Sequence, residues 1–142
     1  MNTAVNPQGC TNLKLRQLMR RIAQHYDTEL AKSGLKATQY SLLSYVIKLG
    51  PIRPSDLAQA MKLEVSTLTR NLKPLVAAGL LVIEAGVDGR SRLISITAEG
   101  RAKRQEAQRH WRVAQDSLNT QLGLERVSQL HALVDESMDL LA

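Results

Sequence analysis

The sequence predicts a mainly α-helical domain that carries one small β-hairpin, and three observations support this fold class. Apolar residues recur at intervals of three and four through most of the 142-residue chain, as amphipathic helices require. Residues 80–97 instead combine strand-forming residues with an Asp-Gly turn. Directly before them, residues 54–79 form two short periodic runs separated by a tight turn. The predicted order in this part is helix, turn, helix, strand, loop and strand.

The first long helix is predicted to begin near Cys10 or Thr11 and to end at Ser33-Gly34. Residues 1–9 contain asparagine, proline, glutamine and glycine, and we expect them to form a flexible arm. The apolar face of the helix comprises Leu15, Leu18, Met19, Ile22, Tyr26 and Leu30.

A second helix is predicted between Thr38, which is expected to cap it, and Gly50-Pro51, which end it. Its inward face comprises Leu42, Leu43, Val46, Ile47 and Leu49.

A helix-turn-helix follows. Its first helix is expected to start at Pro54, because proline suits the first helical position. A short turn at Lys62 and Leu63 leads into a second helix that ends at Gly79. The buried face of this second helix is expected to comprise Val65, Leu68, Leu72, Leu75 and Val76.

The outward face of the second helix carries short hydroxyls, an amide and two cations. Such side chains read base edges and bind phosphates in a DNA major groove. These candidate DNA-contacting residues are Ser66, Thr67, Thr69, Arg70, Asn71 and Lys73.

The predicted hairpin turns between Gly86 and Arg92, so that Arg90 and Arg92 lie at or near its tip. A basic hairpin after a helix-turn-helix constitutes a winged helix. An arginine at the tip of the wing can enter a narrow minor groove, where negative potential is concentrated. Residues 36–97 are therefore expected to form a winged-helix DNA-binding lobe.

Two more helices complete the predicted fold. Thr97 is expected to cap a long helix that ends at Gly123, and the last helix should run from about Leu124 to Leu141. Its wide apolar face suggests a partner, so residues 10–35 and 98–142 are expected to form dimerisation helices. The alternative is that the last helix folds back on its own domain.

Composition narrows the possible functions. A formal net charge of +6 and a pI near 9.8 favour an acidic partner, with nucleic acid first and an anionic membrane surface second. The alternative is a soluble surface with surplus lysine and arginine and no acidic partner. No apolar run is long enough to span a membrane, so a cytoplasmic protein is expected. One cysteine and three scattered histidines predict no metal site, and no catalytic constellation or cofactor motif is present. We expect no enzyme.

Several short motifs together resemble the MarR (multiple antibiotic resistance regulator) family of winged-helix repressors. The resemblance covers nearly the whole chain, as one domain over residues 1–142. The residues that carry it are Leu57-Ala58, Ser66-Thr67-Leu68-Thr69-Arg70, Ala78-Gly79-Leu80, Asp88 with Arg90, Leu93, Ile96-Thr97 and Gly100.

The resemblance implies a homodimer that binds pseudo-palindromic double-stranded DNA and releases it when a small ligand or an oxidant perturbs the dimer. It also implies that Ile52 and Arg53 form a short strand beside the wing. Asp88 is expected to shape the wing by pairing with an arginine rather than to contact DNA.

Family members hold aromatic or phenolic effectors between the dimerisation helices and the DNA-binding lobe. Tyr26, Tyr40 and Tyr45 are therefore candidate pocket residues, although tyrosines at such spacing are more often half-buried packing residues. Cys10 is a candidate redox sensor, because some relatives sense peroxide near the start of this helix. The helix N-terminus and neighbouring Lys14 and Arg16 favour a thiolate there; the alternative is an idle exposed thiol.

The sequence departs from the family pattern at three positions. Glu64 stands where a hydroxyl residue is common, and Ile83 stands where many members have an arginine. Pro74 lies inside the predicted recognition helix and is expected to bend it after Arg70. A second function class stays open, namely a dimeric winged-helix module that binds another protein without specific DNA binding.

Overall fold

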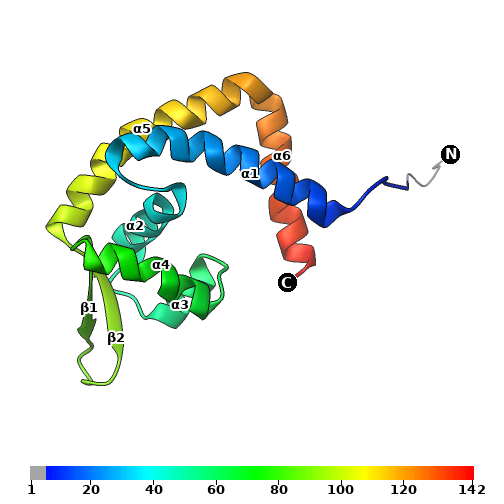
Figure 1. Cartoon of the computed structure of the whole chain (residues 1–142). Helices are drawn as coiled ribbons and strands as arrows, with labels where there is room; N and C mark the ends of the chain where they lie inside the picture. Colours follow the sequence, from blue (N-terminus) through cyan, green and yellow to red (C-terminus); the bar gives the residue numbers. More distant parts are fainter. Residues whose placement is uncertain (1–5) are drawn as a thin grey trace.

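The computed structural model describes residues 6–142, so the first five residues of the predicted arm lie outside the described part (Figure 1). Residues 6–9 are exposed and outside any helix or strand. The elements, in chain order, are α1 (Thr11–Leu30), the 3-10 helix η1 (Ala31–Ser33), α2 (Ala37–Leu49), α3 (Pro54–Ala60), α4 (Val65–Ala77), β1 (Leu81–Ala85), β2 (Arg92–Ile96), α5 (Ala98–Leu122) and α6 (Leu124–Leu140).

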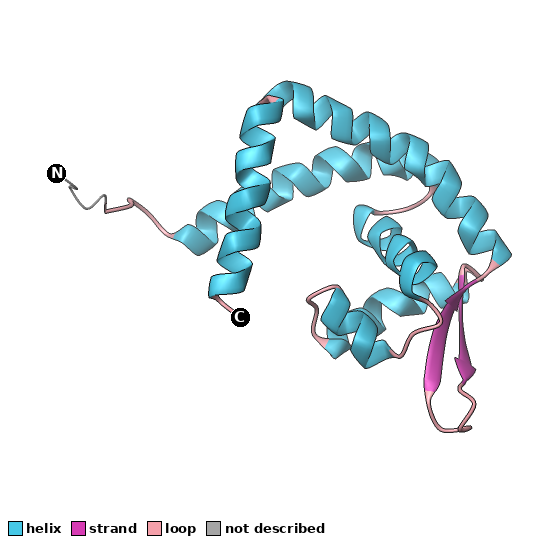
Figure 2. Ribbon diagram, turned by 180° about the vertical axis from the view of Figure 1, so that it is seen from behind, coloured by secondary structure: helices cyan, strands magenta, loops and turns pink. Residues whose placement is uncertain are grey.

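The elements form two regions. Helices α1 and α5 pack side by side, and α6 turns away from α5 at Gly123, whose φ of 85° suits glycine (Figures 1 and 2). We call α1, α5 and α6 the helical layer. Helices α2, α3 and α4 and the two strands form the winged-helix lobe, residues 36–97, which lies to one side of that layer (Figure 1). The predicted fold class, mainly α with a small β wing, is confirmed.

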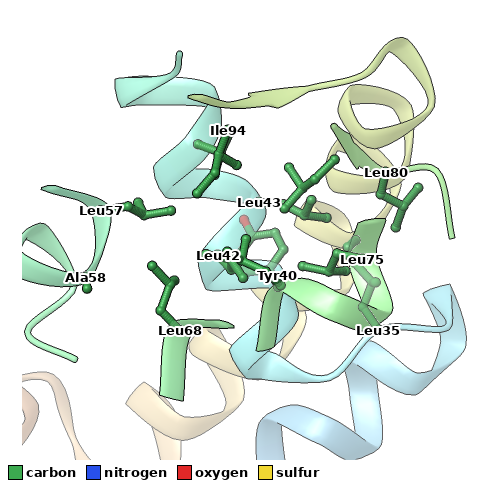
Figure 3. Packing of buried hydrophobic residues seen from close by; sticks show 14 of the residues in the cluster. Leu35, Tyr40, Leu42, Leu43, Leu57, Ala58, Leu68, Leu75, Leu80 and Ile94 are labelled. Atoms are coloured by element: carbon green, nitrogen blue, oxygen red, sulfur yellow. The ribbon is translucent and has the colours of Figure 1, made fainter. Parts of the chain in front are cut away.

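The core of the winged-helix lobe is aliphatic, as a chain without phenylalanine requires. Leu43 of α2, Leu57 of α3, Leu68 and Leu75 of α4 and Ile94 of β2 are all almost fully buried and point toward one another (Figure 3). The predicted apolar faces of these elements therefore meet in one cluster. Burial of each such side chain stabilises the folded state by roughly 1.5–3 kcal/mol.

The two strands pair antiparallel, with Leu81 opposite Ile96 and Ala85 opposite Arg92. Ile52 adds an isolated bridge on the other side of β2, because its N–H donates to the Ile94 carbonyl over 3.1 Å and its carbonyl accepts from the Ile94 N–H over 2.8 Å. Residue 52 therefore pairs with the wing as implied, but as a single bridge and not as a short strand, and Arg53 lies outside the bridge as the N-cap of α3.

Thr97 joins the wing to the helical layer. Its hydroxyl accepts from the Gly100 N–H over 3.0 Å, which confirms the predicted cap of α5, and donates to the Gly79 carbonyl over 2.6 Å. A Cβ on Gly100 would lie 2.0 Å from the Leu80 carbonyl oxygen, so only glycine permits this close approach. The start of α5 is thereby fixed against the end of α4.

Two details of the helices differ from the sequence prediction. Helix α2 begins at Ala37 with Lys36 as N-cap, and not with a Thr38 cap. Asp27 of α1 accepts from the Ala37 N–H over 2.6 Å, so a distant carboxylate replaces the expected hydroxyl. Val65, predicted to be buried, is 49% exposed because it opens α4 at the edge of the lobe. Helix α4 continues through Pro74 to Ala77.

A candidate nucleic-acid interface

Helix α4 presents a polar face away from the core. Ser66, Thr69, Arg70 and Lys73 recur at intervals of three and four, and all four are exposed. Leu68, Leu72 and Leu75 hold the opposite side in the core. Thr67 and Asn71 flank the exposed face and are half-buried. Four of the six predicted residues thus share one outward stripe, and the other two border it.

Few side-chain contacts within the protein engage this stripe. The Thr69 hydroxyl donates to the Val65 carbonyl over 2.9 Å, which leaves its lone pairs outward. Arg70 Nη2 donates to the Thr67 hydroxyl over 3.4 Å, a long contact. Glu64 is the N-cap of α4, is exposed and makes no side-chain cap hydrogen bond. Most donors of the Arg70 guanidinium therefore remain open to a ligand.

The two arginines of the wing lie at different positions along the hairpin. Arg90 lies in the loop between the strands, and Arg92 is the first residue of β2, opposite Ala85 at the base of that loop. Both are exposed. Val87 projects fully into solvent at the tip. Of the two predicted tip arginines, Arg90 is therefore the one in the turn itself.

Asp88 shapes the wing through the loop backbone and Ser91. Its Oδ1 accepts from the N–H groups of Arg90 and Ser91 over 3.0 and 2.9 Å, and its Oδ2 accepts from the Ser91 hydroxyl over 2.6 Å. Hydrogen bonds from Ser91 first, then from Arg90, hold the pKa of Asp88 down at about 2. The expected ion pair with an arginine is not found among the described residues.

Two residues near the wing were missed by the sequence argument. Ser91 fixes Asp88, and the spacing of a carboxylate and a serine three residues apart in a turn was an available signal. Arg53 lines an open hollow of about 400 Å³ beside the wing loop together with Asp88 and Ser91. Its position follows from the Ile52 bridge, which no local sequence pattern specifies.

The three candidate pocket tyrosines lie in different surroundings. Tyr40 is buried in the core, where its ring stacks on Trp111 with centroids 6.0 Å apart and carries the Arg104 guanidinium above it. Tyr45 is exposed on α2. Tyr26 alone of the three lines a cavity of about 370 Å³ between α1, α5 and α6, where its hydroxyl donates to Gln115. The three candidates therefore do not lie around one cavity, and only Tyr26 stays a candidate pocket residue there.

Cys10 lies at the position that the sequence predicted. It is the N-cap of α1, has an extended backbone and is exposed.

The histidines hold structural contacts. His25 lies 3.0 Å from the Ala114 carbonyl, and His110 lies 3.5 Å from Glu29, so both connect α1 to α5. Within residues 6–142, no group of three metal-binding side chains comes together. No helix in the described part is long and apolar enough to cross a membrane.

A helix-turn-helix followed by a hairpin, with an exposed polar stripe on its second helix, defines a winged-helix DNA-binding fold. Comparison with known proteins agrees. The model of the MarR family matches residues 33–91. The uncharacterised HTH-type transcriptional regulator YxaD of Bacillus subtilis is 32% identical over 97 residues, which are 68% of each chain.

Solved structures extend the likeness to nearly the full length. The M. tuberculosis transcriptional regulator MosR, solved in complex with DNA, is 34% identical, and the match covers 94% of this chain and 98% of MosR with a TM-score of 0.80. A mutant MarR from E. coli, complexed with operator DNA, shares the fold at 19% identity, with a TM-score of 0.80 over 89% of this chain and 91% of that one.

The chain belongs to the MarR family of transcriptional regulators. Members of this family regulate transcription and are not enzymes, so the expected function class is confirmed.

Proposed function

We propose that the protein is a homodimeric repressor that binds an inverted-repeat operator in double-stranded DNA. The observation that carries this proposal is the exposed stripe of Ser66, Thr69, Arg70 and Lys73 on α4, backed by a buried leucine face. A helix with this arrangement can enter a major groove without losing any core contact. MosR, the DNA-bound relative at 34% identity, supports the assignment. Such a regulator acts in the cytoplasm, where bacterial DNA lies.

Within the interface we propose a division of roles. Arg70 and Asn71 read bases with Ser66, Thr67 and Thr69, because these side chains offer donors and acceptors that match base edges. Lys73 binds the phosphate backbone. Arg90 and Arg92 contact the flanking minor groove or its phosphates, and Asp88 holds the wing loop in shape.

The dimer is proposed from apolar side chains that the single chain leaves exposed. In α1, Leu15 is 58% and Met19 is 56% exposed; in α6, Leu133 is 59% and Leu140 is 78% exposed. Both helices lie on the side of the molecule away from the wing (Figure 1). Residues 10–35 and 98–142 would then form the dimer region, and two copies of residues 36–97 would meet half-sites about one helical turn apart, ~10 base pairs.

Release from DNA is proposed to follow a small aromatic or phenolic effector. The cavity that Tyr26 lines suits such a molecule, because its walls are mainly aliphatic and a few polar side chains converge on it. The polar residues at this cavity are Tyr26, Gln115, His131 and Asp135. Titrating the DNA complex with simple phenols checks this, and an effector should act less on a Leu130→Trp variant that fills the cavity.

An oxidant is the second proposed signal, acting at Cys10. Its exposure at the start of α1 allows a peroxide to reach it, and a single thiol per chain gives a sulfenic acid, a mixed disulfide or a bridge between subunits. Peroxide should weaken operator binding by the wild type but not by Cys10→Ser. An equal response of both proteins removes Cys10 from the mechanism.

The alternative, a winged-helix module that binds another protein, has less support. A protein-docking face is expected to expose aromatic or large apolar anchors at its centre. On α4 the only large apolar side chain exposed is Val65, at the helix end.

The test is to select bound fragments from the source genome and to titrate them by fluorescence anisotropy at several salt concentrations. We expect a preferred inverted repeat and an affinity that falls steeply with salt. Binding with no sequence preference beyond bulk electrostatics would reject the repressor and favour the protein-binding alternative.

A further inference from the structure

The wing has no net positive charge of its own. Between Leu81 and Ile96 it contains two carboxylates, Glu84 and Asp88, against two arginines. Hydrogen bonds hold the pKa of Asp88 at about 2, so this carboxylate stays ionised at neutral pH. A hairpin with zero formal charge gains little from long-range attraction to phosphates beyond the local contacts of its arginines, so a cation from outside the hairpin would make this edge of the lobe electropositive.

Arg53 is placed to supply that cation. The two hydrogen bonds between Ile52 and Ile94 make residue 52 part of the sheet edge, and the antiparallel register brings residue 53 alongside Leu93, toward the loop. Because Ile52 faces the core, the next side chain points to the opposite face. Arg53 is exposed and borders the hollow beside the wing loop together with Asp88 and Ser91.

The guanidinium of Arg53 keeps its donors. All three hydrogen bonds that Asp88 accepts come from Arg90 and Ser91. No ion pair or side-chain hydrogen bond of Arg53 occurs in the described part of the chain. Asp88 still attracts Arg53 through space, and this attraction favours conformers in which the guanidinium stays beside the wing. A side chain of this kind is close to its site and open to an incoming oxyanion.

We propose that Arg53 binds a DNA backbone phosphate beside the wing and gives this edge of the lobe its net positive charge. The proposal rests on the proposed DNA-binding function and adds a contact from outside both α4 and the hairpin. A phosphate is the fitting ligand, because the planar guanidinium matches two phosphate oxygens and the residue lies beside the base of the wing loop rather than in the loop itself.

Three variants of the full chain test the contact. Arg53→Gln should weaken binding about tenfold in low salt, on the selected operator and on an unrelated duplex alike, and should lower the salt slope by about one. Arg53→Lys should keep the slope. The matched control is Arg109→Gln, which removes the same charge from an exposed position on α5. Once sedimentation shows that this variant is still a dimer, it should change affinity less than about twofold at physiological salt, where distant charges are screened.

Neutral phosphate analogues identify the partner on the DNA. Methylphosphonates are placed one at a time along the backbone flanking each half-site. Wild-type affinity should fall about tenfold at one position, and Arg53→Gln should be insensitive at that same position. Equal sensitivity of both proteins at every position, or equal effects of Arg53→Gln and Arg109→Gln, would overturn the contact.

Failure of this inference is separate from failure of the proposed function. A wild type that shows no operator preference rejects the repressor, yet the Arg53 contact is still measured on the unrelated duplex. A wild type that prefers its operator, together with an Arg53→Gln variant of unchanged affinity and slope, rejects Arg53 alone. Arg53→Gln should unfold at the wild-type temperature, since the side chain is exposed.

Discussion

The winged-helix lobe and the helical layer bury their apolar residues to very different extents. In the lobe, Leu43, Leu57 and Leu68 are at 0% exposure within a single chain. In the helical layer, Leu133 of α6 is 59% exposed and Leu15 of α1 is 58% exposed. The lobe contributes most of the core, which Leu30 of α1 and Ala107 of α5 complete, whereas the outer faces of α1 and α6 present apolar side chains that nothing in the described chain covers. The exposed apolar residues of the helical layer fit the proposed dimer interface, whereas those of the lobe are mostly covered within one chain.

This difference separates two kinds of function within one chain. A closely packed core, shared by the lobe with Leu30 and Ala107, can keep the α4 stripe and the wing in fixed relative positions. Thr97 and Gly100 then join that lobe closely to α5, so a movement of α5 would also move the lobe. The proposed dimer sets the distance between two lobes, and the lobes supply the chemistry of recognition.

The largest expected effect is the loss of the proposed dimer when the exposed apolar face of the helical layer is changed. The double variant Leu133→Glu with Leu140→Glu should be monomeric and should lose specific operator binding, because two exposed apolar positions gain charges and one half-site offers half the contacts. Sedimentation velocity and anisotropy measure the two outcomes. Removal of residues 124–142 should have the same result.

The control places one such charge in the other region. Val87→Glu at the wing tip should stay dimeric and weaken DNA binding only through local repulsion. If the α6 variant also sediments as a dimer, the interface lies elsewhere and the comparison between the two regions loses its basis.

The second effect breaks the core of the lobe. Leu43→Ala should lower the free energy of unfolding by ~2–5 kcal/mol, because it removes a fully buried side chain from close packing. Leu49→Ala, the same change on α2 at a position that is 39% exposed, should cost less than ~1 kcal/mol. Denaturant titration followed by circular dichroism measures both.

The sharper form of this test uses the monomeric α6 variant as background. If the lobe is self-sufficient, the cost of Leu43→Ala should be the same there as in the wild type, within about 0.5 kcal/mol. A much smaller cost in the monomer would show that the lobe depends on the dimer for its order.

Much of the fold was predictable because the decisive signals are local. The periodic faces of α2, α3 and α4, the Thr97 cap and the break at Gly123 each follow from residues close together in the sequence. The cap of α2 was not predictable, since Asp27 reaches it from another helix and displaces the expected Thr38. The exposure of Val65 likewise depends on where the first residue of α4 lies relative to the neighbouring elements.

The candidate site was predictable to a similar degree. The stripe on α4 follows from helical periodicity, because the leucine face fixes which residues point outward. The surroundings of the tyrosines could not be distinguished from the sequence, since Tyr40 and Tyr45 lie on the same helix. Tyr40 is buried against Trp111 of another helix, whereas Tyr45 is exposed. Arg53 depends on a bridge between residues 52 and 94, and such long-range pairing has no local signature.

The third prediction separates base reading from phosphate binding within the lobe. Arg70→Ala should cost ~1–3 kcal/mol of operator binding and relax base preference at one position of each half-site. Lys73→Ala should weaken all sequences similarly and lower the salt slope by about one. Competition with single-base operator variants distinguishes the two. Equal losses across all those variants for Arg70→Ala would make Arg70 a phosphate contact as well.

The smallest effect is confined to the wing and concerns Asp88. Hydrogen bonds from Ser91 and Arg90 stabilise its ionised form in the folded wing, so its pKa is about 2 against an ordinary value of 3.8. The contribution to wing order is therefore complete above the ordinary value and is lost as pH falls from about 4 through about 2. An NMR titration of the Asp88 carboxyl carbon should show its midpoint near the lower value.

Ser91→Ala tests the cause of that shift and completes the comparison. Ser91 makes the largest contribution through its hydroxyl, so the variant should move the Asp88 pKa toward its ordinary value while the backbone N–H groups still lower it in part. The monomeric α6 variant should titrate like the wild type, because the groups that hydrogen-bond Asp88 lie within the same wing loop and Arg53, which attracts it, belongs to the same lobe. A midpoint that changed on loss of the dimer would mean that the helical layer controls the shape of the wing, and the lobe could no longer be treated as an independent unit.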